Sequence, residues 1–328
     1  MSEWHPEVVQ IGKVGKVPDS DNLEITTIYD GYPCIFRCGD FTEGNLAAYI
    51  PIDSLVPVDR EEFKFLTPRA NKYGYVRIKA MRLRGIFSMG LLVKISTNMN
   101  IGDSVTEYFG LKKYEPDLSS VVGLNEVDKG ILPTYTDIEG YRKYSNVIQE
   151  GEQVVLLEKI HGENFRALHD GERLWIGSHH RIKSYSLDTP WWQAAEKYKL
   201  EEKLKMFPEL AFYGEMYGQQ KHFLYDSEVR GKNRLRFFDI KNIETEKYLD
   251  YDSFIQIIQL LELESVPLLY RGPWNPSLIA YAEGKSCLNS DTIREGFVVK
   301  PLIERWDPKI RRTILKFISQ DYLLSKNS

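Results

Sequence analysis

The sequence predicts an α+β protein with two parts. Up to about residue 115, short β-forming runs are separated by turn residues, which is typical of a small barrel. After about residue 145, apolar strand-like runs alternate with two stretches of helical periodicity. A chain of 328 residues is long enough to form two such cores. We therefore expect an N-terminal module over 1–115, a connector over 116–145 and a second, larger domain over 146–328.

The N-terminal strands are indicated by clusters of β-branched and aromatic residues. They lie at 8–11, 23–28, 34–38 and 46–50. Tyr29-Asp30-Gly31-Tyr32 has the composition of a hairpin turn. Residues 76–85 then alternate basic and apolar side chains over most of their length, and a further apolar run follows. Short strands at this spacing favour a barrel over a βαβ sheet.

The alternation at 76–85 predicts a basic stripe on one barrel face. Its members are Arg77, Lys79, Arg82 and Arg84. Tyr73 and Tyr75 precede the stripe and are available for stacking on bases. The alternative is a solvated barrel face with no ligand.

Overall charge and cysteine content limit the classes of function. The net charge is −4, so any polyanion-binding surface must be a local patch. The three cysteines are few, which favours a reducing compartment. Cys34 and Cys38 lack a second Cys/His pair at zinc spacing, which favours small hydrophobic side chains on a strand over a zinc site. No apolar run has membrane length and the first residues do not look like a signal peptide. We expect a cytoplasmic, soluble protein without a membrane partner.

Two helices are predicted in the second part. Thr189-Pro190 offers a helix cap followed by proline in the first turn. The second helix begins near Asp252-Ser253, where apolar residues recur with a period near 3.6. Their apolar stripes indicate core packing.

Lys159 is the most informative single residue. It follows the apolar run 154–157 and stands in Glu158-Lys159-Ile160-His161-Gly162-Glu163-Asn164. A strand followed by a glycine turn holds a lysine at a fixed position, and an unprotonated lysine amine is a nucleophile. Taken alone, Lys-x-x-Gly is more typical of a surface lysine before a hairpin glycine.

Four further segments favour Lys159 as a nucleophile over the surface-lysine interpretation. The sequences are Phe212-Tyr213-Gly214-Glu215-Met216-Tyr217-Gly218, Leu235-Arg236-Phe237-Phe238-Asp239-Ile240, Glu295-Gly296-Phe297-Val298-Val299-Lys300 and Thr313-Ile314-Leu315-Lys316-Phe317-Ile318-Ser319. With 158–164 they resemble motifs I, III, IIIa, IV and V of the covalent nucleotidyltransferases, and Gly177-Ser178-His179-His180-Arg181 resembles motif Ia. The residue pattern at 158–164 most resembles that of the phage double-strand RNA-repair ligases and the trypanosome RNA-editing ligases.

The N-terminal part carries a second resemblance. Residues 18–25 and 83–90 resemble the OB module of tRNA-binding proteins, and a similar module precedes the catalytic domain in Deinococcus-type RNA ligases. Together the resemblances imply an OB-type barrel followed by a nucleotidyltransferase domain, an antiparallel β-sandwich with flanking helices. They imply an ATP-dependent RNA ligase that uses Mg²⁺ or Mn²⁺ and joins RNA 3′-hydroxyl and 5′-phosphate ends, with nicked duplex among the candidate substrates, in RNA repair.

The resemblance also implies roles for individual residues. Lys159 would be the nucleophile that carries AMP. Glu295 and Glu215 would serve the metal, directly or through water. Phe238 would stack on adenine. The other ATP- or AMP-binding candidates are Glu158, Ile160, Asn164, Arg181, Glu215, Lys300 and Lys316. The stripe of four basic residues would bind RNA.

Lys300 and Lys316 would contact phosphate and, by like-charge repulsion, lower the pKa of Lys159. Asp239 has an alternative role as a structural hydrogen-bond acceptor. His179 and His180 would position their loop or contact RNA rather than ligate metal.

Two positions depart from the motif pattern. His161 stands where many members have a metal-associated aspartate, and motif V has Lys316 without its usual second lysine, so Arg311 or Arg312 would assist. Two rival functions remain at this stage. One is a GTP-using capping enzyme, against which the absence of a module after motif V argues. The other is a non-catalytic RNA-binding protein, against which the intact motif set argues.

Overall fold

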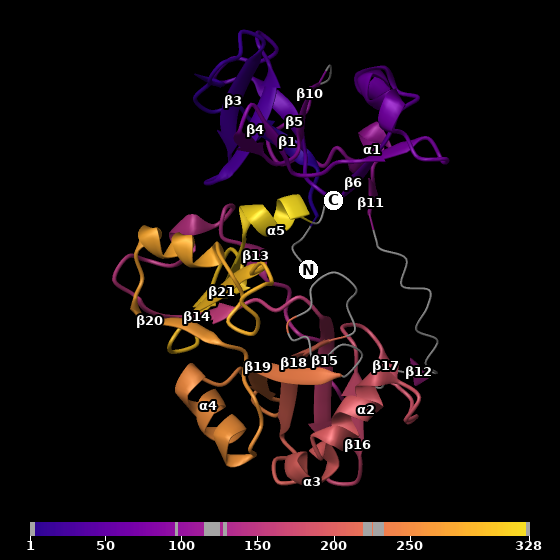
Figure 1. Ribbon diagram of the computed structural model, residues 1–328, viewed down its shortest axis with the longest axis vertical. Coiled ribbons are helices and arrows are strands. Elements are labelled where there is room, and N and C mark those ends of the chain that lie inside the picture. The colour runs from indigo at the N-terminus through magenta and orange to yellow at the C-terminus, as the bar shows by residue number, and fades with distance from the viewer. Residues whose placement is uncertain are drawn as a thin grey trace. The chain divides into compact units, whose positions relative to one another are not determined.

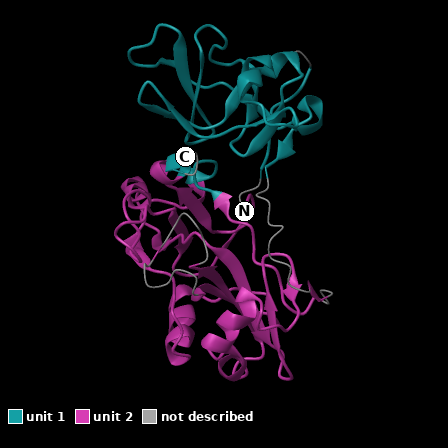
Figure 2. Ribbon diagram, turned by 45° about the vertical axis from the view of Figure 1, so that its right-hand side comes forward, with its two compact units in different colours: residues 1–117, 140–145, 323–328 teal, residues 118–139, 146–322 magenta. Residues whose placement is uncertain are grey.

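The computed structural model describes residues 4–95, 98–114, 125–126, 130–218, 225 and 233–325. The chain forms two compact units, shown in different colours in Figure 2. Unit 1 comprises Met1–Asp117, Gly140–Ser145 and Leu323–Ser328, and unit 2 comprises Leu118–Glu139 and Asn146–Tyr322. Residues 140–145, which the sequence placed in a connector, count with unit 1. There the Asp30 amide donates to the Arg142 carbonyl (3.0 Å), and the Lys143 ammonium pairs with Glu7 (2.8 Å).

Unit 1 is built from short strands. Its elements are β1 (Glu7–Gln10), β2 (Gly15–Lys16), β3 (Leu23–Ile28), β4 (Tyr32–Arg37), β5 (Leu46–Ile50), β6 (Ser54–Pro57), η1 (Glu61–Arg69), β7 (Tyr75–Arg77), β8 (Met81–Leu83), β9 (Ile86–Ser88), β10 (Leu91–Lys94), α1 (Thr106–Phe109) and β11 (Lys112–Lys113). They pair as β1-β5-β10, β11-β6-β7, β2-β3-β4 and β8-β9. The expected hairpin at 29–32 is present between β3 and β4. The predicted OB-type fold is confirmed as a set of small antiparallel sheets rather than a fully closed barrel.

The basic run at 76–85 does not form one strand. Arg77 lies on β7 and Arg82 on β8, which belong to different sheets, whereas Lys79 lies between the two strands and Arg84 follows β8. Residues on separate sheets do not share one strand's alternation, so the sequence pattern alone overstated their common face.

Unit 2 contains two larger antiparallel sheets, labelled in Figure 1. The elements that follow unit 1 in the chain are β12 (Asn125–Glu126), β13 (Glu139–Gly140), η2 (Ser145–Val147), β14 (Gln153–Glu158), β15 (Glu163–His169), β16 (Leu174–Gly177), β17 (Ile182–Lys183), α2 (Pro190–Lys197), α3 (Leu200–Leu204), β18 (Leu210–Tyr217), β19 (Arg234–Asn242), α4 (Tyr251–Leu260), β20 (Leu268–Pro273), η4 (Pro276–Ala282), β21 (Gly296–Pro301), β22 (Trp306–Asp307), β23 (Arg311–Arg312), β24 (Leu315–Ile318) and α5 (Gln320–Ser325). The sheets have the orders β12-β17-β16-β15-β18-β19 and β13-β24-β21-β14-β20.

The two predicted helices are present and pack against the six-stranded sheet. In Figure 1, α2 and α3 lie beside β15 and β16, whereas α4 lies beside β19. The Thr189 side chain caps α2 by accepting from the Trp192 amide, and Pro190 occupies the first turn. Trp191, Trp192 and Phe254 point into one continuous apolar core with strands β14, β15, β18 and β19. Within the described residues, no helix is both long enough and apolar enough to cross a lipid bilayer.

Gly296 marks the closest backbone approach in the second sheet. Its φ is +148°, and a Cβ added there would lie 2.0 Å from the Phe317 carbonyl oxygen. Only glycine accepts both this backbone conformation and the tight β21–β24 pairing.

We predict that Gly296→Ala destabilises the protein by well over 1 kcal/mol, because the methyl group has no space and the backbone conformation is strained. Urea unfolding monitored by circular dichroism measures this. Gly15→Ala is the control, since a Cβ at Gly15 would have its nearest neighbour at 3.7 Å. Equal stability of both variants would contradict the steric argument.

Candidate active site

Lys159 is fixed by strand pairing. It follows the last residue of β14, and its backbone amide donates to the Gly296 carbonyl at 3.0 Å. One position earlier, Glu158 pairs with Phe297 in the antiparallel register of β14 and β21. Glu295, which immediately precedes β21, is therefore brought next to Lys159, although the two residues are far apart in the sequence.

The Lys159 side chain forms an ion pair at this junction. Its Nζ lies 2.9 Å from Glu295 Oε1, and the Glu295 side chain is only 9% exposed. Burial by itself would lower the pKa of Lys159, but the carboxylates of Glu295 and Glu215 outweigh burial and raise it. The expectation that neighbouring lysines lower this pKa is wrong for this structure, since the acidic groups determine the direction.

Glu215 is the second buried carboxylate of the cluster. It lies on β18 directly opposite Asn164 of β15. Burial raises the pKa of Glu215 to about 7, Lys159 opposes the shift and Glu295 adds to it. Two buried oxygen atoms here, Asn164 Oδ1 and Glu295 Oε2, have no hydrogen-bond donor among the described residues. Such oxygens are costly unless a cation or ligand satisfies them.

Gly162 allows this close arrangement. A Cβ at Gly162 would lie 2.3 Å from the Met216 carbonyl oxygen and 2.9 Å from Glu215 Cγ. The glycine of the lysine motif therefore brings the turn after Lys159 directly over Glu215.

Lys316 is the second lysine of the cluster. It lies on β24 opposite Val298 of β21 and is almost fully buried. Burial, with the positive charge of Lys159 adding to it, lowers the pKa of Lys316 to about 7. Like-charge repulsion is thus present, but it acts on Lys316.

His161 extends the cluster. Its Nδ1 lies 2.8 Å from the Tyr322 hydroxyl and 3.8 Å from Glu295 Oε2. The imidazole therefore lies beside the metal candidate Glu295.

Lys300 is in different surroundings. It is completely buried, and its Nζ contacts Asp239 Oδ1 at 2.9 Å and Glu304 Oε1 at 3.3 Å. Arg312 pairs with the same two carboxylates and lies over the Tyr248 ring at 3.5 Å. Arg312, suggested as an assistant to Lys316, is therefore part of a buried ion network instead.

Asp239 is the centre of that network. It accepts from Tyr135 Oη at 2.7 Å in addition to Lys300 and Arg312. Burial alone would raise the pKa of Asp239, but Arg312 and Lys300 outweigh it and lower the pKa. The role of Asp239 as a hydrogen-bond acceptor agrees with these contacts.

Phe238 lies beside the network. It is half-buried, and its ring meets the Tyr135 ring edge-on with centroids 5.0 Å apart. The network thus fixes the backbone next to the aromatic candidate for base stacking.

The two neighbours of Lys159 are buried. Ile160 packs in the main core of unit 2. Glu158 accepts hydrogen bonds from the Ser286 hydroxyl and from the Cys287 amide (2.8 Å), and the Arg294 guanidinium lies 3.9 Å away. Glu158 therefore anchors the loop that leads into Glu295.

The motif Ia candidates lie in the turn between β16 and β17 of the six-stranded sheet. Arg181 has an exposed side chain, and its carbonyl accepts from the Ser178 amide at 2.9 Å. His179 packs edge-on against His180, and burial, with His180 adding to it, lowers the pKa of His179 to about 4. The buried Arg166, which the sequence did not single out, holds this loop through the Ser178 carbonyl at 2.6 Å.

The four basic residues of the predicted stripe in unit 1 have different surroundings. Arg77 pairs with Asp53 and stacks on Tyr114 with the guanidinium 3.8 Å from the ring centre. Arg77 and Lys79 line a cavity, whereas Arg82 and Arg84 lie at β8 and its turn and do not line it.

Comparison with known proteins identifies the family of the chain. The RNA ligase family model matches residues 152–318, just over half of the chain. The chain belongs to the RNA ligase family. An OB-fold domain model matches residues 6–95. A search of curated proteins found no match.

The fold is also that of solved RNA ligase structures. Naegleria gruberi RNA ligase with PPi superposes with a TM-score of 0.86 at 24% identity, covering 99% of this chain and 100% of that one. A mutant of the same ligase with ATP and Mn gives 0.84 at 23% identity, covering 98% and 99%. Another mutant with AMP and Mn gives 0.82 at 23% identity, with the same coverage. At this identity the likeness establishes the fold, including the OB module before the ligase domain.

No sequence motif marks three residues of this RNA ligase family member that contact the candidate site. Tyr135 contacts Asp239, Glu304 contacts Lys300 and Tyr322 contacts His161. Tyr135 lies in the low-periodicity stretch assigned to the connector, so no pattern marked it. Buried tyrosines and charges are recognised only when their partners are known.

We predict that Glu295→Gln lowers the pKa of Lys159 in this RNA ligase family member, because it removes the main anion that raises it. The pH dependence of reductive methylation at Lys159, followed by mass spectrometry, measures the pKa. Glu264→Gln, at a half-exposed carboxylate paired with Arg236, is the control. An unchanged or higher pKa in Glu295→Gln would contradict the assignment.

We predict that Lys316→Met changes the pH dependence of stability. The folded pKa of about 7 lies below the ordinary 10.5, so the wild type loses stability as pH falls from about 10 to 7. The variant lacks this loss and gains a few kcal/mol relative to wild type near pH 7. Urea unfolding between pH 7 and 10 tests this, and parallel curves for both proteins would refute it.

Proposed function

We propose that the protein is an ATP-dependent RNA ligase that joins 3′-hydroxyl and 5′-phosphate RNA ends through a lysyl-AMP intermediate on Lys159. The observation that carries the proposal is the amine of Lys159, held 2.9 Å from the buried carboxylate of Glu295 in a chain of the RNA ligase family. The similar Naegleria ligase was solved with PPi, with ATP and Mn, and with AMP and Mn, the molecules that this chemistry involves.

The first step would transfer AMP to the lysine. The ammonium of Lys159 first loses a proton, and the amine then attacks the α-phosphorus of ATP. A nitrogen–phosphorus bond forms and the bond to pyrophosphate breaks. Lys316, which is buried with a pKa near 7, would contribute positive charge beside the phosphate when protonated.

Two further transfers would complete ligation. AMP passes from Lys159 to the RNA 5′-phosphate, which forms a phosphoanhydride and frees the lysine. The RNA 3′-hydroxyl then attacks this activated phosphate, the phosphodiester forms and AMP leaves. Each step is phosphoryl transfer at an anionic centre, which needs cations and in-line positioning.

The residues present fit a divalent cation. No group of three or more His, Cys, Asp and Glu side chains with metal-binding geometry occurs among the described residues. Mg²⁺ and Mn²⁺ nevertheless bind with few protein ligands and retain water. Glu295 Oε2, buried without a donor, and Glu215, whose pKa burial raises to about 7, are the oxygen ligands available. When bound, the cation would neutralise phosphate charge.

The nucleoside would be recognised by residues around this centre. We assign Phe238 to stacking on adenine, Asn164 and Glu215 to polar contacts, and Glu158 with Ile160 to positioning of the loop and the nucleophile. Arg181, exposed on its loop, is available for phosphate. Lys300 would act through the buried network beneath Phe238 rather than by direct contact with phosphate.

The RNA would be bound in part by unit 1, with Arg77, Lys79, Arg82 and Arg84 as candidate phosphate contacts. Nicked duplex is one candidate substrate, and RNA repair is the process that we propose. The three cysteines are free thiols, which agrees with a reducing, cytoplasmic location.

We predict that Lys159→Ala abolishes covalent labelling by radioactive ATP in the presence of Mg²⁺ or Mn²⁺, because the nucleophile is removed. Denaturing electrophoresis detects the adduct. Lys205→Ala, at an exposed lysine near α3, is the matched control and should label like wild type.

Three results would refute the proposal. Undiminished labelling of Lys159→Ala would exclude this nucleophile. Labelling of the wild type by GTP in preference to ATP would favour a capping-type guanylyltransferase. No labelling by either nucleotide would favour an RNA-binding protein without catalysis.

A further inference from the structure

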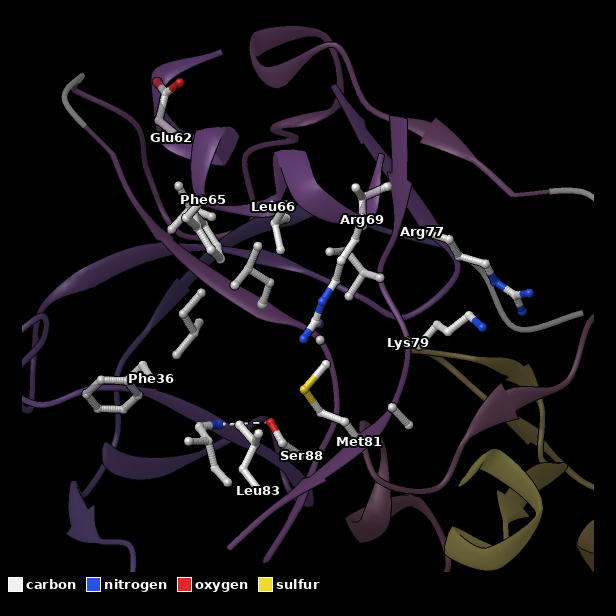
Figure 3. A pocket seen from close by; sticks show the side chains of 18 of the residues that line it. Phe36, Glu62, Phe65, Leu66, Arg69, Arg77, Lys79, Met81, Leu83 and Ser88 are labelled. Atoms are coloured by element: carbon white, nitrogen blue, oxygen red, sulfur yellow. Dashed lines mark hydrogen bonds between the residues drawn. The ribbon is translucent and has the colours of Figure 1, made fainter. Parts of the chain in front are cut away.

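Unit 1 contains a large cavity that the catalytic proposal does not use. Its volume is about 1250 Å³. It opens where the apolar clusters of the module fail to meet: Phe36 belongs to one cluster, Leu66 to a second and Ala80 to a third, and all three residues line the space. Figure 3 shows this space between η1 and strands β4, β8 and β9.

The walls are apolar and include aromatic faces. Phe36 and Met81 form part of the lining, and Phe65 stands at the edge with 64% of its surface exposed. An exposed phenylalanine beside an apolar hollow is unfavourable in water and indicates a ligand with a flat, weakly polar face.

The charges of the cavity are predominantly positive. Arg77 and Lys94 are each paired with an aspartate. Among the described residues, Arg37, Arg69 and Lys79 form no ion pair with a carboxylate, and they also line the cavity. Figure 3 shows Arg69 extending from the end of η1 toward Met81, into the centre of the space, whereas Lys79 points to one side.

A ligand that matches these walls needs flat apolar faces and anionic groups a short distance apart. Single-stranded RNA has both, because each base has a π face and each link carries a phosphate. A purely apolar ligand would leave the three cations unused, and a double helix would keep its bases stacked away from Phe65.

We propose that this cavity receives unpaired bases of the RNA substrate, with Phe65 stacking on a base and Arg69 binding an adjacent phosphate. The proposal rests on RNA being the substrate of the protein. It goes beyond the basic stripe, because Phe65 and Arg69 lie outside it and only two of the stripe residues line the cavity. The unit would then distinguish single-stranded segments from continuous duplex.

Fluorescence anisotropy with the full-length protein tests the proposal. The probes are a labelled single-stranded RNA oligonucleotide and a blunt RNA duplex of the same length. Phe65→Ala and Arg69→Glu should each weaken binding of the single strand by about fivefold or more, the loss expected from one stacked base or one phosphate contact. Binding of the duplex should change much less.

Two control variants match these changes. Ile101→Ala removes an equally exposed apolar side chain of unit 1, and Lys16→Glu reverses an exposed charge on β2; neither residue lines the cavity. Thermal unfolding shows whether each variant is folded, and Phe65→Leu provides a second, milder variant if the first is unstable.

Photo-crosslinking of RNA that contains 5-iodouridine should join the base to a peptide containing Phe36 or Phe65.

Three results would overturn the proposal. These are cavity variants that bind single-stranded RNA like the control variants, equal losses for single strand and duplex, and crosslinks confined to other peptides. Labelling of wild-type protein by ATP without RNA tests the proposed ligase chemistry separately. If labelling fails while the cavity variants lose affinity for single strands, the base-binding site stands and the catalytic proposal falls.

Discussion

The candidate site depends on the antiparallel pairing of β14 with β21. The hydrogen bond from the Lys159 amide to the Gly296 carbonyl continues this pairing one residue beyond β14. It sets the nucleophile candidate beside Glu295, and the adjoining β21–β24 pair brings Lys316 to the same sheet. Gly296 is the residue that permits the strands to approach so closely. A side chain there would disturb the backbone and the site together.

Buried charge is distributed over two clusters with different consequences. Around Asp239, carboxylates and cations satisfy one another, so the network holds its neighbours in one arrangement. Around Lys159 the compensation is incomplete. Glu215 has a pKa raised to about 7, Lys316 has one lowered to about 7, and Glu295 retains an oxygen without a donor. Such incomplete compensation costs stability and is typical of a site prepared for a charged ligand.

The sequence predicted elements most reliably where the signal was local. The capped helix after Thr189, the helix near Asp252 and the hairpin at 29–32 depend on neighbouring residues, and all three occur in the structure. The run at 76–85 predicted a single basic face that the structure does not form. Alternation shows which residues share a face of one strand, but it does not reveal that the strand is interrupted. Residues that act through distant partners, such as Tyr135 and Glu304, carry no local signal at all.

The sequence by itself determined the order of the motifs, the two-part fold class and the membership of Lys159, Glu215, Glu295 and Lys316 in one motif series. Only the tertiary structure decided which charges meet. Lys300 and Lys316 look equivalent in the sequence, yet one is neutralised by Asp239 and Glu304 and the other faces Lys159. The direction of a pKa shift depends on burial and on charges brought together by strand pairing across many residues. The cavity of unit 1 has the same origin, because its walls come from three separate apolar clusters that are brought together only in the folded module.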